Sequence, residues 1–151
     1  MVLIFEIKTL SDFEYFDFPE SDLSHMLANV HGWNALRGKR ILITGATGFI
    51  GKCLLASFLN ANRRLHLGAR VLVLSRDVNK FKNLYPFLKG ASEIDWIQGD
   101  IRTFSLDAKL KCDMAIHAAT DVIAKRRPSE IFEDCVSGTR NVIEQLDRFD
   151  C

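Results

Sequence analysis

The sequence has few cysteines, and their spacing builds no site. The four of them, Cys53, Cys112, Cys135 and Cys151, are scattered along the chain without a paired spacing. This scatter argues against a zinc site and against a disulfide framework, and it favours reduced thiols inside the cell. We therefore expect no metal centre.

Long apolar runs and targeting segments are also missing. No apolar run approaches the roughly 20 residues that a membrane-spanning helix needs. The start of the chain, Met1–Phe5, is apolar, but it has no basic region before it and no small-residue cleavage site after it. We therefore expect a cytoplasmic protein without a secretory signal and without a membrane partner.

Dense basic clusters are almost absent. The only such run is Lys125–Arg127, and no aromatic residues are interleaved with it, so we expect a solvated loop there and no nucleic-acid partner. Acidic residues gather in the first 34 positions, which leaves the remainder net basic. A basic surplus suits an anionic ligand such as a nucleotide.

What the sequence does contain is a regular alternation of apolar strands and helical patterns. The unbroken apolar run 71–74 is typical of a strand covered on both faces of a parallel sheet. Alternation of this kind predicts parallel βαβ units, and hence an α/β fold with a doubly wound parallel sheet of the Rossmann type. The expected strands are 40–44, 71–74, 94–97 and 114–116, and the expected helices are 49–60, 77–84 and 128–146.

Two regions are expected along the chain. Residues 1–37 form a lead segment with a short helix, which Ser21 or Asp22 could cap and which runs to Val30. Residues 38–151 form an incomplete α/β domain.

A glycine-rich loop joins the first expected strand to the helix that follows it. Residues 44–51 read Thr-Gly-Ala-Thr-Gly-Phe-Ile-Gly. The first turn of a helix has unsatisfied backbone N–H groups, and the helix dipole favours an anion there, so this context predicts a phosphate site. Gly45 would make the tight turn, Gly48 would lie against the phosphates, and Gly51 would let the helix pack closely on its strand. The alternative is an ordinary glycine turn.

This loop resembles that of the short-chain dehydrogenase/reductase superfamily, and Gly48-Phe49-Ile50-Gly51 resembles its extended branch, the NAD(P)-dependent sugar-nucleotide epimerases and dehydratases. The resemblance implies the cofactor-binding half of such an enzyme, with a dinucleotide as ligand. A complete relative would also take a nucleotide-sugar substrate and can be a homodimer.

The residues after the second expected strand bear on the choice of cofactor. An acidic residue there would favour NAD, but this chain has Ser75 and Arg76, followed by Asp77. Arginine can pair with a 2′-phosphate and stack on adenine, so we expect NADP in preference to NAD. Alternatively, Arg76 is a solvated loop residue beside a helix cap at Asp77.

Two later turns also match the family. The turn at Asp100 and Ile101 resembles the Gly-Asp-aliphatic turn that holds the adenine edge, and 118–120 resembles the segment that lies against the nicotinamide ribose and the pyrophosphate. His117, beside that segment, is expected to be structural. The full set of expected cofactor-binding residues is Gly45, Thr47, Gly48, Phe49, Ile50, Gly51, Ser75, Arg76, Asp100, Ile101, Ala118, Ala119 and Thr120.

Two features depart from the family. Cys135 stands three residues before Gly138, where the family usually has Asn. The catalytic Tyr-x-x-x-Lys of the family follows a fifth strand, and only Tyr85 and Lys89 have that spacing here. They lie between the second and third strands, and Pro86 opposes a helix joining them, so we expect no catalytic residue in this chain.

Three functions are therefore open. The chain could be the NAD(P)-binding portion of a sugar-nucleotide epimerase or dehydratase, cut before the catalytic half and inactive alone. It could be a dinucleotide-binding module without chemistry. It could also be a remnant that does not fold alone, because an open sheet edge would be left unpaired.

Overall fold

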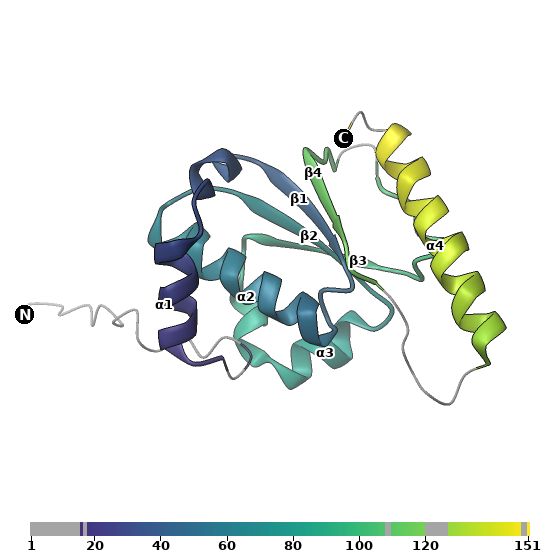
Figure 1. Cartoon of the computed structure of the whole chain (residues 1–151), viewed down its shortest axis with the longest axis horizontal. Helices are drawn as coiled ribbons and strands as arrows, with labels where there is room; N and C mark the ends of the chain where they lie inside the picture. Colours follow the sequence, from purple (N-terminus) through teal and green to yellow (C-terminus); the bar gives the residue numbers. More distant parts are fainter. Residues whose placement is uncertain (1–15, 17, 108–109, 120–126, 149–150) are drawn as a thin grey trace, which may run out of the picture.

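The computed structural model describes residues 16, 18–107, 110–119, 127–148 and 151 (Figure 1). Within these residues a parallel sheet of four strands forms the centre of the molecule, and its strand order is β3-β2-β1-β4. The strands are β1 (Arg40–Thr44), β2 (Arg70–Ser75), β3 (Ile94–Gln98) and β4 (Met114–His117).

The strand order reverses next to β1. The chain steps outward from β1 to β2 and β3, and then returns to place β4 on the other side of β1. Thr44 pairs with Leu74 in β2 and with His117 in β4, so the carboxyl ends of these strands meet at one edge of the sheet. This topology confirms the doubly wound, Rossmann-type sheet, and such a reversal is where open α/β sheets bind ligands.

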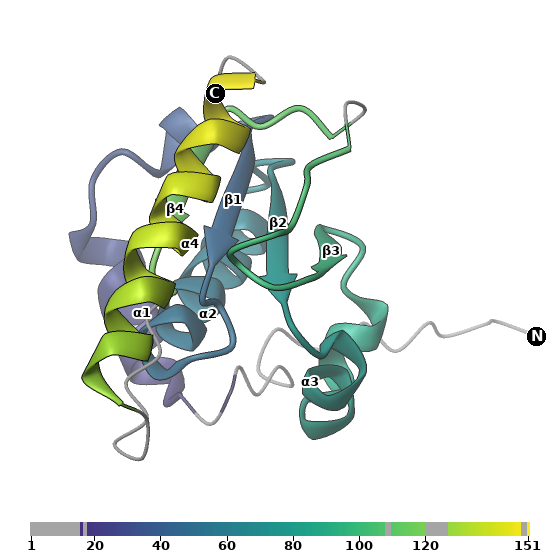
Figure 2. The ribbon, with the colours of Figure 1, turned by 90° about the vertical axis from the view of Figure 1, so that its right-hand side faces the viewer.

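Helices cover both faces of the sheet (Figure 1, and Figure 2 from the side). On one face lie α1 (Glu20–Asn29), α2 (Phe49–Arg64) and α3 (Val78–Leu84), and on the other lies α4 (Pro128–Arg148). Two short 3-10 helices, η2 (Trp33–Leu36) and η3 (Pro86–Gly90), complete the described elements. Among these residues no helix is both long enough and apolar enough to cross a membrane.

Alternate residues of each strand point to opposite faces, which gives the sheet two apolar cores. Ile41 and Ile43 in β1 pack with the α2 side, whereas Leu42 between them packs with Phe104 and Val142 on the α4 side. The apolar run 71–74, predicted to be a strand covered on both faces, is thus buried because each face has its own helical cover, whereas all four residues of β4 are exposed.

The lead helix α1 packs on α2. Asn60 Nδ2 donates to the Leu23 carbonyl at 3.3 Å, and Arg64 forms an ion pair with Glu20 at 2.7 Å. The predicted cap at Ser21 or Asp22 is wrong, because the helix begins at Glu20 after Pro19, and both residues lie in its first turn without a side-chain cap.

Helix α2 runs four residues beyond its predicted end at Asn60, to Arg64. Asn62, a polar residue that suggests the end of a helix, instead makes buried hydrogen bonds within the fold. Asn62 is buried, donates from Nδ2 to the Ala69 carbonyl at 3.0 Å, and accepts from the Ala69 amide at 2.9 Å. The side chain therefore holds the entry to β2, and a buried polar group of this kind cannot be distinguished from a surface one by sequence pattern.

Helix α4 also differs in detail from the prediction. It runs to Arg148, beyond its predicted end at residue 146, and Ile143 is 60% exposed whereas Gln145 is buried. Gln145 Oε1 accepts from the Leu106 amide at 3.0 Å, so this polar side chain anchors the segment that precedes β4.

Candidate functional site

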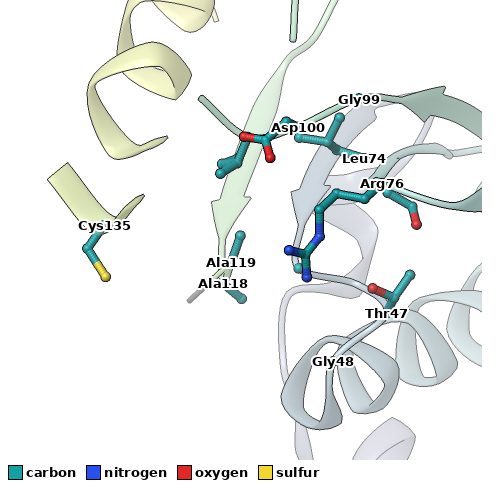
Figure 3. Close-up of a pocket in the computed structure, with 12 residues that line it drawn as sticks. Thr47, Gly48, Leu74, Arg76, Gly99, Asp100, Ala118, Ala119 and Cys135 are labelled. Atoms are coloured by element: carbon teal, nitrogen blue, oxygen red, sulfur yellow. The ribbon is translucent and has the colours of Figure 1, made fainter. Parts of the chain in front are cut away.

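A pocket lies at the carboxyl edge of the sheet, beside the point where the strand order reverses (Figure 3). The loop after β1, the ends of β2 and β3, the end of β4 and one turn of α4 all contribute to its wall. The lining residues are Gly45, Thr47, Gly48, Leu74, Ser75, Arg76, Gly99, Asp100, Ile101, Ala118, Ala119 and Cys135.

The glycine loop can adopt its conformation only because two positions, Gly45 and Gly51, have no side chain. Gly45 has φ 72°, in the left-handed region, and a Cβ there would lie 2.5 Å from the Ala118 carbonyl carbon. Gly51 is buried in α2, and a Cβ there would overlap the Gly45 carbonyl and lie 2.5 Å from Ala46 Cα. Gly51 therefore supports the loop from behind and does not line the pocket.

Gly48 is the N-cap residue of α2, and no described side chain caps this helix. Its amide donates to the Gly45 carbonyl at 2.9 Å. The amides of the first turn of α2 are thus left for water or a ligand, and the end of a helix dipole favours an anion there. The side chains of Phe49 and Ile50 are 73% and 61% exposed, and neither residue lines the pocket. Any role of these two residues in binding would therefore come from their backbone amides.

Opposite the loop, the ends of β2 and β3 bring a positive and a negative side chain into the pocket wall. Arg76 is exposed, and its guanidinium points into the space between the glycine loop and Ala118 (Figure 3). Ser75 is buried, and its Oγ accepts from the Asp77 amide at 3.2 Å. Asp77 caps α3 by accepting from the Lys80 amide at 2.9 Å, which confirms the predicted cap.

Asp100 remains charged in this wall. Its carboxylate accepts from the Arg102 side chain, with Nε at 2.8 Å and Nη2 at 3.1 Å, and from the Arg102 amide at 3.0 Å. These Arg102 contacts, with a smaller contribution from the charge of Arg76, hold the pKa of Asp100 below its usual value. The pairing with Arg102 was not foreseen, because it depends on the turn geometry after β3.

Helix α4 fixes the turn that carries Asp100 and Ile101. A Cβ at Gly138 would lie 3.0 Å from Ile101 Cγ2, so the glycine permits close packing of α4 on this turn. Asn141 Nδ2 donates to the carbonyls of Ile101 at 2.9 Å and Phe104 at 3.1 Å.

Most of the expected cofactor residues come together in the pocket. Phe49, Ile50 and Gly51 lie in α2 beside it, and Thr120 falls outside the described residues. The pocket also contains Leu74, Gly99 and Cys135, which were not in the expected set. Cys135 lies three residues before Gly138, so both residues lie on one side of α4. This spacing was the feature of the sequence that could have identified Cys135 as a pocket residue.

His117 ties three elements together rather than facing the pocket. Its Nδ1 lies 2.7 Å from Thr44 Oγ1 in β1, and its Nε2 lies 3.0 Å from Thr139 Oγ1 in α4. Burial lowers the pKa of the imidazole, which favours the neutral ring. Neutral imidazole has one donor and one acceptor, and two hydroxyls satisfy both.

A pH dependence of stability follows from His117. Its pKa in the folded protein lies below the usual 6.5, so the unfolded chain binds more protons in the window below pH 6.5. The stabilisation is therefore complete above that pH and is lost as the pH falls through the folded-state pKa. We expect the thermal midpoint of the protein to fall as the pH drops below about 6.5, and we expect a flatter profile for His117→Gln.

Thermal melts of both proteins across this range are the measurement. The carboxyls with lowered pKa, Asp95, Asp100 and Asp113, titrate below 3.8 and do not interfere. Parallel profiles for the two proteins would contradict this role of His117.

Tyr85 and Lys89, which have the Tyr-x-x-x-Lys spacing, both lie outside the pocket wall. The Tyr85 hydroxyl accepts from Lys52 Nζ at 3.1 Å, and its ring packs edge-on against Phe16 with centroids 4.7 Å apart. The residue follows the end of α3 and is not part of the pocket wall.

Comparison with known proteins gives a consistent result. The model of the NAD dependent epimerase/dehydratase family matches residues 41–151. The UDP-glucose 4-epimerase of Neisseria meningitidis serogroup B is 31% identical over 121 residues, which are 73% of this chain and 33% of that protein. The relative from serogroup C matches to the same extent. The chain thus spans about a third of the length of the curated relatives it matches.

Solved structures show the same fold. The protein Pen from Bacillus thuringiensis is 26% identical with a TM-score of 0.57, over 74% of this chain and 34% of that one. An epimerase from Methanothermobacter thermautotrophicus has the same fold, with 21% identity and a TM-score of 0.55, over 78% of this chain and 34% of that one. The resemblance to extended short-chain dehydrogenases is thereby confirmed. Because the family match begins in β1 and includes every residue that lines the pocket, the chain belongs to the NAD-dependent epimerase/dehydratase family.

Proposed function

We propose that these residues form the NAD(P)-binding portion of a sugar-nucleotide epimerase or dehydratase. The observation that carries the proposal is the uncapped start of α2, with its glycine loop, at the edge where the strand order reverses. The loop turns tightly at Gly45, where a Cβ would collide with the Ala118 backbone, so this turn excludes a side chain. A dinucleotide needs close approach of the backbone to its pyrophosphate, and glycines permit it.

The residues around the loop fit the other parts of the ligand. The pyrophosphate would lie on the amides at the start of α2, and Asp100 with Ile101 would hold the adenine edge. Ala118 and Ala119, with small side chains, would leave room for the nicotinamide ribose. The nicotinamide, when bound, supplies the acceptor for a hydride from the substrate.

Binding can be tested and localised by the reactivity of Cys135. We expect NADP to slow maleimide labelling of Cys135 about tenfold at ten times its Kd, since about a tenth of the sites then remain empty. Cys53 is the matched control, because it is also partly buried but does not line the pocket. Labelling is read by peptide mass mapping. Equal slowing at both cysteines, or at neither, would contradict the assignment of the pocket.

Arg76 is proposed to select NADP over NAD. Its guanidinium can make a charge-assisted contact only with the 2′-phosphate, and solvent exposure reduces the gain to about tenfold in affinity. We expect Arg76→Ala to weaken NADP about tenfold and to leave NAD within about twofold, as measured by calorimetric titration. Arg37→Ala removes a charge before β1, at the opposite edge of the sheet, and should change neither affinity. An unchanged preference in Arg76→Ala would reject the role.

We propose further that these residues carry out no hydride transfer by themselves and that a nucleotide sugar is the substrate of the whole protein. The similarity to UDP-glucose 4-epimerases supports the substrate class. Tyr85 is held by Lys52 away from the pocket, so it offers no phenolate to a bound sugar. Turnover of a UDP-sugar by this chain, abolished in Tyr85→Phe, would overturn this part of the proposal.

A further inference from the structure

Two cysteines that are far apart in sequence are in contact beside β4. Cys112 precedes β4, and Cys151 follows α4. The Cys151 thiol donates a hydrogen bond to Cys112 Sγ, and the two sulfur atoms are 2.8 Å apart across a separation of 39 positions. Both cysteines are free thiols in this structure.

The backbone around each sulfur atom is held by hydrogen bonds. The Cys151 amide donates to the Leu146 carbonyl at 3.1 Å, which anchors it to the last turns of α4. Cys112 Sγ donates to the Met114 carbonyl at 3.0 Å. The next residue, Asp113, exchanges hydrogen bonds with Arg40 in β1, each at 2.8 Å. The sulfur contact is therefore set by the fold of two anchored segments.

The two thiols differ in access to solvent. Cys112 is 4% exposed and belongs to the apolar core on the α4 side, whereas Cys151 is exposed. A reagent in solution can thus reach Cys151 first, and Cys112 lies in contact behind it. This is the arrangement of an attacking thiol and a resolving thiol.

We propose that Cys112 and Cys151 are a redox-active thiol pair, which a low-molecular-weight disulfide such as oxidised glutathione converts to an intramolecular disulfide. The Cys151 thiolate attacks one sulfur atom of the reagent's disulfide. A mixed disulfide forms between Cys151 Sγ and that atom, the disulfide bond of the reagent breaks, and the other half of the reagent leaves as a thiolate. The Cys112 thiolate then attacks the Cys151 sulfur and displaces the second thiol. Each cysteine loses its proton to solvent and each leaving thiolate takes one up, so two protein thiols are oxidised while one disulfide is reduced to two thiols.

The surroundings of the pair set the pH dependence of this reaction. Partial burial, the hydrogen bond to Cys112, and the negative charges of Cys112 and nearby Asp113 raise the pKa of the Cys151 thiol to about 12. Only the thiolate attacks, so the first step should accelerate about tenfold per pH unit from pH 7 to 9.

The disulfide would join the end of α4 covalently to the segment before β4. Such a link closes a loop across 39 positions and restricts the unfolded chain. We expect the oxidised protein to unfold at a temperature roughly 5–15 °C above that of the reduced protein.

The experiment oxidises the folded full chain with oxidised glutathione and maps its disulfides by non-reducing peptide mass analysis. We expect the Cys112–Cys151 link to form about tenfold faster than any other pairing, because the two thiols are already in contact. Exposed Cys151 is changed to Ser, which should abolish the link and the rise in melting temperature without unfolding the protein. Cys53→Ser is the matched control and should retain both.

The outcomes separate the possibilities. A Cys112–Cys151 peptide pair that is absent from Cys151→Ser and also slower to form in denaturant supports the proposal. A stable glutathione adduct at Cys151 in the parent protein, which Cys112 fails to resolve, overturns it. So does a dominant link through Cys53 or Cys135, or between two chains.

Discussion

Gly51→Ala is expected to destabilise the fold strongly. The new Cβ would overlap the Gly45 carbonyl and approach Ala46 Cα to 2.5 Å, and both contacts are backbone atoms that cannot rotate away. Overpacking of this kind costs about 3 kcal/mol at the upper end of its usual range. The melting temperature should therefore fall by roughly 6–12 °C.

Gly90→Ala is the matched control for this change. A Cβ at Gly90 meets nothing within 4 Å, and its φ is not in the left-handed region. That variant should melt at or slightly above the parental temperature, because alanine reduces the freedom of the unfolded chain. If both variants melt together, α2 does not depend on close approach to the loop after β1.

Gly48→Val should have the opposite profile, with binding lost and the fold retained. Gly48 has φ −79° and ψ 178°, which any residue can adopt, so valine would not strain the backbone there. Its Cβ would lie 3.3 Å from the Gly45 carbonyl oxygen, which is tight but not a collision. The branched side chain would instead fill the space at the start of α2 that a pyrophosphate needs.

Thermal melts with and without NADP separate the two glycines. A ligand at 100 times its Kd stabilises the parent by about 2.7 kcal/mol, which corresponds to roughly 5–10 °C. Gly48→Val should keep a near-parental melting point without ligand and show none of this rise. A full rise in Gly48→Val would mean that the loop is not the phosphate site, and the proposed function would fail with it.

The features that could be predicted from sequence depend on neighbours along the chain. The apolar run 41–43 and the glycines that follow it define a strand, a turn and a helix start, and the structure places all three as expected. The cap at Asp77 is equally local, since its acceptor and donor are three residues apart.

The features that were missed depend on contacts between distant segments. Asn62 looks like a helix-ending residue until β2 is placed beside it, and Cys135 enters the pocket only because α4 packs against the turn after β3. The contact between Cys112 and Cys151 likewise requires the whole of α4 to be positioned. Spacing along the chain can place Cys135 on the same side of α4 as Gly138, but it does not show which distant segment that side meets.

The two hydrogen bonds from Asn141 have a consequence for affinity. They fix the carbonyls of Ile101 and Phe104, and so the turn that carries Asp100, within the protein itself. A ligand arriving at this wall of the pocket meets a surface that is already ordered, and it need not restrict a mobile turn. Preorganisation of this kind raises affinity by lowering the entropic cost of association, without adding any contact to the ligand. The strength of binding at this wall would thus be set partly by Asn141, which does not itself line the pocket.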